Sequence, residues 1–381
     1  MRIAHVTTVH RWDDGRIFER QARSLQRAGH EVTVLAPGTE RFSVDGVDVI
    51  PLGIAHRRTD RMWRLVREAG RVLRTMALDV VVVHDPELLR LLVSLSLRRS
   101  APILVYDAHE DYAAQLRDKE WLPRRLRGVL SATLGRVEQF SVGRLDHVLA
   151  ATPAIARRFD PSRTTVVLNR PEVTSLAVLP SPAVSERVDA VARKESTVVY
   201  IGDLRAVRGA TALVDAIARL GNWSARLRLA GRITPPSLED ELESLPGWDR
   251  VEVCGWLALD EVFGLLAEAD VGVLPFLPAA NHVESQPNKL FEYLVMGLPV
   301  AMSDFPTWVE LARSVGGRFE VFTPGDAGAL AEAIAKLLSD PESSDRVKRS
   351  ARAREVLSWE RCESSYVRCI ESLLVGTRRV K

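Results

Sequence analysis

The chain has 381 residues, of which 46% are hydrophobic and 27% are charged. A chain of this length is typical of two domains, and a chain this apolar can bury enough surface to fold. Its 52 basic and 50 acidic residues give a net charge of +2. This balance argues against a dedicated nucleic-acid-binding protein, because such a protein carries a clear basic excess.

The sequence predicts neither a membrane-spanning helix nor a secretory signal. The best apolar candidate, residues 88–97, is interrupted by Arg90 and is much shorter than the about 20 residues that a crossing helix needs. Met1 and Arg2 lead directly into a short strand-like run.

The chain has three cysteines, and Cys254 has no Cys or His neighbour at metal-binding spacing. We therefore expect a reducing, cytoplasmic location with no disulfide and no structural zinc.

Strand-like and helix-like segments alternate through the first hundred residues. Short runs of Val, Ile and Leu indicate strands, and apolar residues that recur every three or four positions indicate helices. Continuous apolar strands separated by helices predict a parallel sheet covered on both faces. We expect strands at 2–9, 31–36, 47–52, 79–83 and 102–106, and helices at 17–25, 61–76 and 88–97.

A proline-containing stretch interrupts this pattern, and the alternation then starts again. The sequence therefore predicts two doubly wound α/β domains, residues 1–172 and 197–356, joined by a linker at 173–196. An amphipathic helix follows within residues 357–381. In the second domain we expect strands at 197–201, 226–230, 251–254, 271–274 and 299–302, and helices at 210–220, 238–245, 259–267, 288–296 and 327–338.

The most informative segment surrounds the start of the predicted helix 288–296. Ligands bind parallel sheets beyond the carboxyl ends of the strands, so we looked for polar residues in the loops there. Glu284 and Glu292 stand eight residues apart in the segment E-S-Q-P-N-K-L-F-E, which is soon followed by G-L-P-V. Backbone N–H groups at a helix N-terminus attract phosphate, and carboxylates suit sugar hydroxyls. Solvated glutamates are the alternative explanation for such a pair taken alone.

In this context the sequence resembles the retaining glycosyltransferases of family 4, which have the GT-B fold, and several motifs agree in order along nearly the whole chain. The resemblance implies two Rossmann-like domains that face each other across a cleft. The first domain would bind the acceptor and the second the nucleotide sugar. The segment Ser358-Trp359-Glu360, followed by a helix, resembles the family element that crosses back to the first domain.

The resemblance also assigns roles to the residues of the glutamate segment. Glu284 would contact the donor sugar as a catalytic residue, and Glu292 would hold the ribose hydroxyls of the nucleotide. Lys289 and the backbone N–H groups near Leu290 and Phe291 would face the diphosphate.

A second motif, Y-I-G-D-L-R-A-V-R-G, follows the first strand of the second domain. The family usually has Gly-Arg-x4-Lys-Gly here, and its two cations neutralise the donor diphosphate. Arg208 takes the Lys position, as a catalytic residue that stabilises the leaving group, and Gly202 belongs to the same donor-binding loop. Asp203 takes the Arg position, which is a departure from the family pattern, and Arg205 is the candidate for the missing charge.

The loop after the first strand, H-R-W-D-D-G-R-I-F, is poorer in glycine than the family version. Gly15 is the glycine that could let the backbone approach a phosphate, and Arg16 is the expected donor contact beside it. Asp13 and Asp14 are expected to bind the acceptor, and one of them is also expected to cap the following helix.

Two predicted strand ends of the first domain carry histidines next to carboxylates. The family places a histidine near the reacting sugar, and His109 is the match in this chain. His84 and Asp85 follow the neighbouring strand, where the acceptor is expected to enter. A histidine with a purely structural role is the alternative at each position.

The nucleobase is expected beside Gly231 and Trp256, which follow successive strands of the second domain. Trp256 would either stack on the base or pack in the core.

One basic helix face stands apart from these motifs. Such faces attract anionic lipid headgroups, and related enzymes often use lipid-linked acceptors. We therefore expect the protein to make peripheral contact with the inner face of an anionic membrane. A solvated helix face is the alternative. The arginines that recur on it are Arg57, Arg61, Arg64, Arg67, Arg71 and Arg74, and Arg117, Lys119, Arg124, Arg125 and Arg127 lie nearby in sequence.

The sequence therefore predicts a retaining, metal-independent glycosyltransferase of the hexosyltransferase class, without a cofactor. The expected donor is a nucleotide-diphosphate sugar, with UDP as the nucleotide. The acceptor would be a hydroxyl of a glycan, a lipid-linked glycan or a natural product, and no nucleic acid is expected as a partner. Two alternatives remain open: a nucleotide-sugar 2-epimerase of the same fold, and a non-catalytic glycosyltransferase-like binding subunit.

Overall fold

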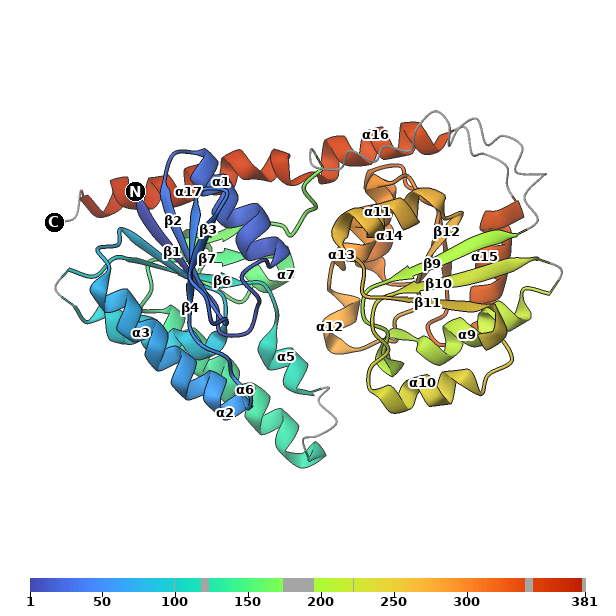
Figure 1. The fold of residues 1–381 in the computed structure, drawn as a ribbon, viewed down its shortest axis with the longest axis horizontal. Coiled ribbons are helices and arrows are strands. Elements are labelled where there is room, and N and C mark those ends of the chain that lie inside the picture. The colour runs from blue at the N-terminus through green and yellow to red at the C-terminus, as the bar shows by residue number, and fades with distance from the viewer. Residues whose placement is uncertain (99, 118–122, 174–194, 222, 340–344, 379–381) are drawn as a thin grey trace. The chain divides into compact units, whose positions relative to one another are not determined.

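The computed structural model describes residues 1–98, 100–117, 123–173, 195–221, 223–339 and 345–378. The chain divides into two compact units. Unit 1 comprises Met1–Asn169 and Trp359–Lys381, and unit 2 comprises Arg170–Ser358 (Figure 1). Nearly all of the predicted linker 173–196 lies outside the described residues. In the described chain no helix is long and apolar enough to cross a membrane, and all three cysteines are free thiols.

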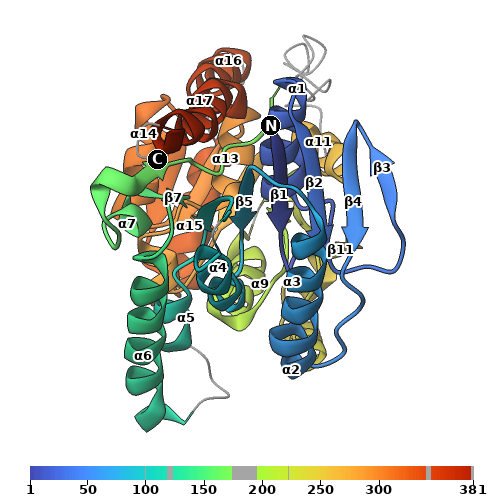
Figure 2. The same ribbon diagram turned by 90° about the vertical axis from the view of Figure 1, so that its left-hand side faces the viewer.

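Unit 1 is built on an eight-stranded sheet with the order β3-β4-β2-β1-β5-β6-β7-β8. All neighbouring strands are parallel except β3, which pairs antiparallel with β4. Figure 2 shows several of these strands side by side with their arrowheads toward one edge of the sheet. The strands are β1 (Arg2–Val6), β2 (Glu31–Ala36), β3 (Phe42–Val44), β4 (Val47–Pro51), β5 (Val80–Val83), β6 (Ile103–Ala108), β7 (His147–Ala150) and β8 (Thr164–Val166).

Helices cover both faces of this sheet, because side chains along each strand alternate between the two faces. Val81 and Val83 enter one apolar core, whereas Val80 and Val82 enter the other. The helical segments are η1 (Gly15–Ala22), α1 (Arg23–Arg27), α2 (Arg58–Asp60), η2 (Arg61–Leu65), α3 (Val66–Thr75), η3 (Pro86–Leu88), α4 (Leu89–Ser96), α5 (Tyr112–Arg117), α6 (Arg124–Val142), α7 (Pro153–Ala156), η4 (Pro161–Arg163) and α17 (Trp359–Arg378).

The last helix, α17, completes unit 1 although it follows unit 2 in the sequence. It contacts η1 and α1 (Figure 1). Trp359, Tyr366 and Ile370 are buried in the same core as Phe18, and the Trp359 indole Nε1 donates to Ser24 Oγ over 2.9 Å. The return of the chain to its first domain, which the family resemblance implied, is therefore confirmed.

Unit 2 has a six-stranded parallel sheet with the order β11-β10-β9-β12-β13-β14. The prediction of two parallel α/β sheets is confirmed. The strands are β9 (Ser196–Ile201), β10 (Ala225–Ala230), β11 (Val251–Gly255), β12 (Val271–Leu274), β13 (Val300–Ser303) and β14 (Phe319–Phe322). The helical segments are η6 (Ala206–Arg208), α9 (Ala210–Arg219), α10 (Pro236–Glu243), η7 (Trp248–Arg250), α11 (Leu259–Glu268), α12 (Ala280–Val283), α13 (Asn288–Val295), α14 (Pro306–Ser314), α15 (Ala327–Ser339) and α16 (Arg346–Leu357).

The loop after β9 approaches the loop after β12 at a position where only glycine fits. Gly209 has a φ of 75°, and a Cβ atom built on it would lie 1.8 Å from the Pro275 carbonyl oxygen. Leu277 N donates to Val207 O over 3.0 Å in the same contact. The glycine therefore fixes how closely the two loops pack.

A buried ion pair lies at the centre of unit 1. Arg16 reaches both carboxylate oxygens of Asp107, over 2.8 and 2.6 Å, and its third nitrogen donates to Val167 O over 2.9 Å. Arg16 is 4% exposed and Asp107 is fully buried. Burial alone raises the pKa of Asp107, but Arg16 and then His84 hold it well below its ordinary value. The carboxylate therefore stays ionised inside the unit.

We expect Gly209→Ala to lower the free energy of unfolding by more than about 2 kcal/mol, because the residue is held at positive φ against a backbone carbonyl. Gly264→Ala is the control, since a Cβ there meets nothing within 4 Å and its position inside α11 favours alanine. Urea unfolding followed by circular dichroism measures both. Equal stabilities of the two variants would contradict the close approach.

We expect Arg16→Ala to cost about 3–5 kcal/mol of stability, because it leaves a buried carboxylate without its cation. Arg11→Ala is the matched control: Arg11 pairs with Asp13 over 2.9 Å, but its own side chain is 79% exposed, so the loss should stay below about 1 kcal/mol. Urea unfolding at pH 7 compares the two. A loss for Arg16→Ala as small as that of the control would contradict a buried, ionised pair.

Candidate functional site

The loops that follow β9, β10 and β12 are tied together at the carboxyl edge of the unit 2 sheet. Leu204 N donates to Arg232 O over 2.8 Å, which joins the loop after β9 to the loop after β10. The Tyr200 hydroxyl donates to Asp203 O over 3.0 Å. These bonds fix the backbone of the segment that the sequence analysis assigned to the donor.

Two glycines let the loop after β9 pack closely against the loop after β10 and against Lys289. Gly202 and Gly231 have φ values of 82° and 152°, and a Cβ on Gly231 would lie 2.4 Å from the carbonyl of Gly202. A Cβ on Gly202 would lie 2.6 Å from Lys289 Nζ. The lysine head therefore occupies the space that a side chain at position 202 would need.

Lys289 and Arg208 form a cation pair, the name used below for these two side chains. Lys289 Nζ lies 5.5 Å from the centre of the Tyr200 ring and 5.8 Å from that of Phe276. Arg208 Cζ lies 5.6 Å from the same Phe276 ring, and its Nη1 donates to Asp203 O over 2.5 Å. Among the described residues no carboxylate comes within ion-pair distance of either cation.

The electrostatics of the cation pair favour an anionic ligand. Burial and the neighbouring Arg208 lower the pKa of Lys289 to about 8, although Glu292 and Asp203 act in the opposite direction. A lysine that burial and a like charge push toward neutrality gains most from a negative group that enters beside it. A diphosphate has the charge and the oxygen atoms for this site.

Helix α13 carries both Lys289 and Glu292 and is anchored under the sheet. The Tyr293 hydroxyl accepts a hydrogen bond from Ile201 N over 3.2 Å, and a Cβ on Gly272 would lie 2.8 Å from the Tyr293 ring. The side chains of Leu290 and Phe291 are buried. Leu290 N donates to Pro287 O over 3.0 Å, so this expected phosphate donor is already used in the first turn of the helix.

Glu284 lies directly after α12 and is exposed. Helix α14 holds the backbone on either side of it: Thr307 Oγ1 donates to Val283 O, and Trp308 Nε1 donates to Ser285 O, each over 2.8 Å. No contact recorded for the described chain joins Glu284 to Lys289 or Arg208. The structure thus brings Glu292 into the field of Lys289, whereas the placement of Glu284 at the donor sugar stays a prediction.

Two other predicted donor residues, Arg205 and Trp256, are exposed. Arg205 is exposed, and its Nη2 lies 3.8 Å from Asp203 Oδ2. Arg205 therefore faces the carboxylate that replaces the family arginine. Trp256 is 70% exposed, so of its two predicted places the core is excluded.

In unit 1 the predicted acceptor residues His84 and Asp85 are fully buried, which corrects the expectation that they contact an acceptor. Asp85 Oδ2 accepts from Thr7 Oγ1 over 2.8 Å and from Thr8 N over 2.6 Å, and thereby shapes the loop after β1. His84 bridges Asp107 Oδ2 and the ring of His5, each over 3.0 Å. Both side chains therefore hold the neighbouring strand ends and the loop after β1 in place, and neither reaches the surface.

The loop after β1 also differs from its expected roles. Arg16 is committed to Asp107 and Val167, so it is a structural ion-pair partner and does not fit the predicted donor contact. Asp14 caps η1 by accepting from Arg16 N over 2.8 Å, which confirms that one of the two aspartates caps the helix. Asp13 pairs with the exposed Arg11. A Cβ on Gly15 would make only ordinary contact, 3.6 Å from Arg20.

His109 lies at the end of β6 and is joined to His10 in the loop after β1. Their Nε2 atoms are 3.2 Å apart. His109 Nδ1 lies 3.2 Å from the Asp107 carbonyl oxygen, and the Tyr112 hydroxyl lies 3.4 Å from His109 Nε2. Burial is the largest influence and lowers the pKa of His109; Asp107 raises it, whereas the positive charges of Arg16 and His10 lower it further. His109 is thus held neutral and partly accessible.

One group of side chains in the described chain has the ligand types of a metal site. Atoms of His84, Asp107 and His109 lie within 4.8 Å of one another. Arg16 already binds both oxygens of Asp107, and a cation placed among these groups would compete with that guanidinium. The donor set therefore suits an ion-pair network better than a metal ion.

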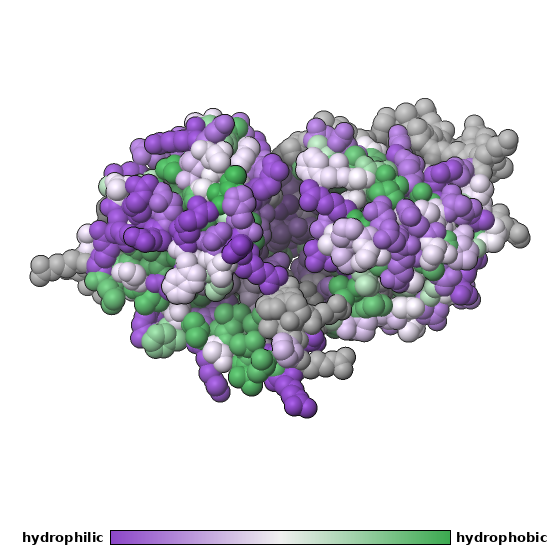
Figure 3. Space-filling model, turned by 60° about the horizontal axis from the view of Figure 1, so that its bottom comes forward, coloured by the Kyte–Doolittle hydropathy of each residue, from purple (hydrophilic) through white to green (hydrophobic). Residues whose placement is uncertain are grey.

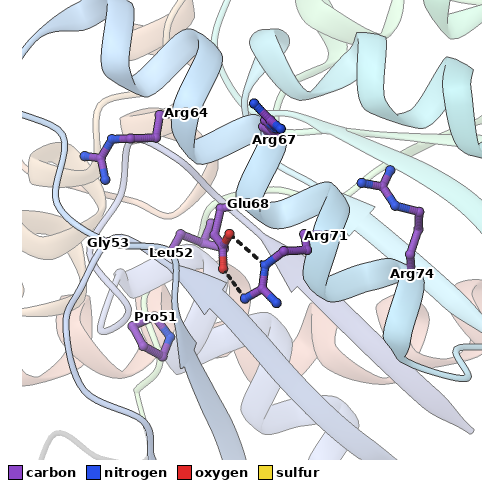
Figure 4. Close-up of a pocket in the computed structure, with 8 residues that line it drawn as sticks. All are labelled: Pro51, Leu52, Gly53, Arg64, Arg67, Glu68, Arg71 and Arg74. Carbon is purple, nitrogen blue, oxygen red and sulfur yellow. Dashed lines mark hydrogen bonds and ion pairs between the residues drawn. The ribbon is translucent and has the colours of Figure 1, made fainter.

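A separate pocket of about 560 Å³ lies beside the end of β4. Figure 4 shows Arg64, Arg67, Arg71 and Arg74 spaced along the helix that forms one wall. Glu68 pairs with Arg71 over 3.0 and 2.6 Å, and Pro51, Leu52 and Gly53 form the facing wall. Four cations against one carboxylate leave the pocket positively charged.

The sequence pattern did not indicate Asp107 as the buried ionic partner of Arg16, nor His10 as the neighbour of His109. Asp107 lies inside a strand that reads as uniformly buried, so nothing in the pattern distinguished it. His10 lies in a loop and meets His109 from 99 residues away, so no local spacing in the sequence could indicate their contact.

Comparison with known proteins identifies the family. A family model described as "Glycosyl transferase 4-like domain" matches residues 15–170, and one described as "Glycosyl transferases group 1" matches residues 195–340. The glycogen synthase of Mycobacterium tuberculosis is 25% identical over 374 residues, which cover 89% of this chain and 86% of that protein. The MMP alpha-(1->4)-mannosyltransferase of Mycolicibacterium hassiacum is 26% identical over 172 residues, only 44% of this chain and 41% of that relative's length.

Solved structures with the same fold cover nearly the whole chain. Sucrose-phosphate synthase from Thermosynechococcus elongatus has a TM-score of 0.78 at 17% identity, covering 99% of this chain and 100% of that one. HepE of Anabaena, solved in complex with UDP-glucose, has a TM-score of 0.72 at 16% identity, covering 98% and 100%. Since the two family models together span most of both units and these neighbours share the fold, the chain belongs to the group 1 glycosyltransferases, of the GT4 type and the GT-B fold.

Proposed function

We propose that the chain transfers a sugar from a nucleotide-diphosphate sugar to an acceptor hydroxyl, with retention at the anomeric carbon. The observation that carries this proposal is the cation pair, which stands at the carboxyl edge of the unit 2 sheet without a carboxylate at ion-pair distance in the described chain. Such a site is built to receive an anion, and the diphosphate of a donor supplies one.

In this proposal the cation pair stabilises the negative charge that develops on the leaving diphosphate as the glycosidic bond breaks. Arg208 is held in place by Asp203 O, and Lys289 approaches the backbone at Gly202, so both charges are positioned before the donor binds. They provide charge neutralisation without a metal ion. Arg205 is a third cation that can reach the donor from the exposed end of the loop.

The remaining donor contacts follow from the placement of α13 and its neighbours. Glu292 lies in the field of Lys289 and would accept hydrogen bonds from ribose hydroxyls. Glu284 would contact the sugar ring, and Trp256, which is largely exposed, would stack on the base. We propose UDP as the nucleotide, in line with the UDP-glucose bound by the Anabaena neighbour.

Unit 1 would supply the acceptor side. His109 is neutral and partly accessible at the end of β6, and Asp13 is partly exposed in the loop after β1. Both offer hydrogen-bonding groups to a sugar hydroxyl. His84 and Asp85 are left out of this assignment because they are buried.

We expect Arg208→Ala and Lys289→Met each to weaken UDP binding at least about tenfold, since a charge-assisted contact contributes about 1.5–3 kcal/mol. Arg219→Ala is the control, because Arg219 is an exposed residue of α9 that pairs with Asp215 over 3.1 Å. Isothermal titration calorimetry of the full chain with UDP measures the three affinities. Unchanged affinity in both site variants would sink the proposed donor site.

The pH dependence of the same titration provides an internal check. Lys289 has a pKa of about 8 in the free protein, and only its protonated form attracts the diphosphate. UDP affinity should therefore be level below this pH and fall as the pH rises through it, and Lys289→Met should remove that fall. If UDP affinity declines equally in the wild type and in Lys289→Met, the decline comes from the titration of another group.

We also propose that unit 1 contacts an anionic membrane surface, where a lipid-linked acceptor would be presented. The arginine pocket of Figure 4 offers a place for a phosphate headgroup, because arginine binds phosphate through paired N–H donors. Exposed apolar side chains, among them Met62, Trp63, Leu126 and Val129, would enter the headgroup layer. Lys119 lies outside the described residues, and the side chain of Arg124 is not described.

Figures 2 and 3 show at which end of unit 1 the proposed membrane surface lies. Figure 2 shows α2 and the first part of α6 extending past the edge to which the strands of unit 1 point. Figure 3, which brings this end of the molecule forward, shows apolar side chains gathered among hydrophilic ones on the lower part of unit 1. The acceptor residues at the strand ends and the proposed membrane surface therefore belong to the same end of the unit.

We expect the chain to bind vesicles that contain phosphatidylglycerol and not vesicles of phosphatidylcholine alone. Replacing Arg64, Arg67, Arg71 and Arg74 with Gln should weaken binding more than about tenfold, because each basic residue near the surface contributes about 1 kcal/mol. The charge-matched control replaces the exposed unit 2 residues Arg219, Arg313, Lys348 and Arg352 with Gln. Vesicle co-sedimentation decides: equal binding by the two quadruple variants would contradict the proposed surface.

A further inference from the structure

His10 and His109 share a hydrogen bond whose geometry determines where their protons are. The Asp107 carbonyl oxygen can only accept, so His109 Nδ1, 3.2 Å away, carries the proton. The pKa of His109 is lowered, so its ring is neutral and its Nε2, which also lies 3.4 Å from the Tyr112 hydroxyl, is a hydrogen-bond acceptor. Because His10 Nε2 lies 3.2 Å from it, a hydrogen bond between the rings requires the proton to be on His10 Nε2.

The other nitrogen of His10 must also carry a proton. His10 Nδ1 lies 3.1 Å from Asp14 Oδ2, and a carboxylate can only accept. With protons on both nitrogens, His10 is an imidazolium cation. The arrangement Asp14–His10–His109–Asp107 is thus satisfied at each of its bonds by a charged His10 and a neutral His109.

The groups that face His10 agree with this assignment. Asp14 from the start of η1, Asp85 from the end of β5 and Glu110 after β6 all act to raise its pKa, and together they outweigh burial, which is the largest single effect and lowers it. His10 Nε2 lies 3.8 Å from Asp85 Oδ1, an oxygen that is buried without a hydrogen-bond partner in the described chain. The remaining neighbour is His109, whose own pKa is lowered.

We propose that His10 is a positioning residue that stays protonated and, through its Nε2–H, fixes the orientation of His109, whose tautomer the Asp107 carbonyl sets, at the acceptor side of the site. This inference rests on the proposed function, in which His109 meets the reacting sugar. The loop after β1 is poor in glycine, and on this view it contributes a charged side chain where the family more often has flexible backbone.

The assignment has a consequence at alkaline pH. Once His10 loses a proton it keeps the one on Nδ1, because Asp14 holds it. Two nitrogen lone pairs then face each other across 3.2 Å, and one ring has to turn. The orientation of His109, and with it the proposed transfer, should therefore be lost as the pH rises through the pKa of His10, and not as the pH falls.

Histidine side-chain 15N NMR of the full-length chain tests this without any substrate. The His10 signals, identified by their absence in His10→Gln, should titrate above the ordinary pKa of 6.5, and His109 should remain an Nδ1–H tautomer while His10 is charged. Asp14→Asn should lower the pKa of His10, yet Asn retains the helix cap and an oxygen acceptor for His10 Nδ1. Glu371→Gln is the control, because Glu371 pairs with His30 over 3.1 Å elsewhere in unit 1.

The pH profile of kcat for UDP release at saturating UDP-glucose provides the functional readout, because saturation removes the effect of Lys289 on donor binding. Its alkaline limb should coincide with the His10 titration and move to lower pH in Asp14→Asn, but not in Glu371→Gln. A His10 that titrates at or below 6.5, or an alkaline limb that stays in place in Asp14→Asn, would overturn the inference. Failure of the proposed function is recognised separately, because it would appear as a chain that does not bind UDP in calorimetry.

Discussion

Two cations without a carboxylate at ion-pair distance in the described chain organise the proposed donor side of this protein. Lys289 and Arg208 flank the Phe276 ring at the carboxyl edge of the unit 2 sheet, and burial makes the proximity of two cations costly in the free protein. The surrounding glycines make the arrangement possible. Gly209 lets the loop after β9 pack against Pro275, and Gly202 leaves room for the lysine head. An anion that binds between or beside the two cations would offset the electrostatic cost of holding them close together in the unliganded protein.

The same arrangement explains a departure from the family pattern. Asp203 stands where the family usually has arginine, and its carboxylate does not lie at ion-pair distance from Arg208 or Lys289 in the described chain. Its backbone carbonyl instead accepts from both Arg208 and Tyr200. On the proposed function, Lys289 of α13, which approaches this loop at Gly202, would supply positive charge from a different element of the same unit.

Much of this fold could be predicted from the sequence because both sheets are parallel and buried. Runs such as Val80–Val83 and Val271–Leu274 are continuous apolar strands, and the helices between them keep a clear period. The sequence did not predict the elements within residues 107–170, which are α5, α6, β7 and β8. Exposed apolar residues in this segment, such as those of α6, hide the regular spacing by which a helix is recognised. For the site, motif spacing found Arg208, Lys289 and Glu292. It could not show that Arg16 turns inward to Asp107, or that His84 and Asp85 are covered, because burial depends on contacts between distant segments.

The position of α17 has a consequence for how the chain reaches its native state. Trp359, Tyr366 and Ile370 fill the same core as Phe18 and Leu25, yet about 190 residues of unit 2 separate them from the rest of unit 1. During synthesis the amino-terminal segment leaves the ribosome with part of one sheet face, beside η1 and α1, uncovered, and that apolar surface stays open until the final helix arrives. Unit 2, in contrast, is a continuous segment that can close before synthesis ends. The part of the chain made first is thus the last to be completed.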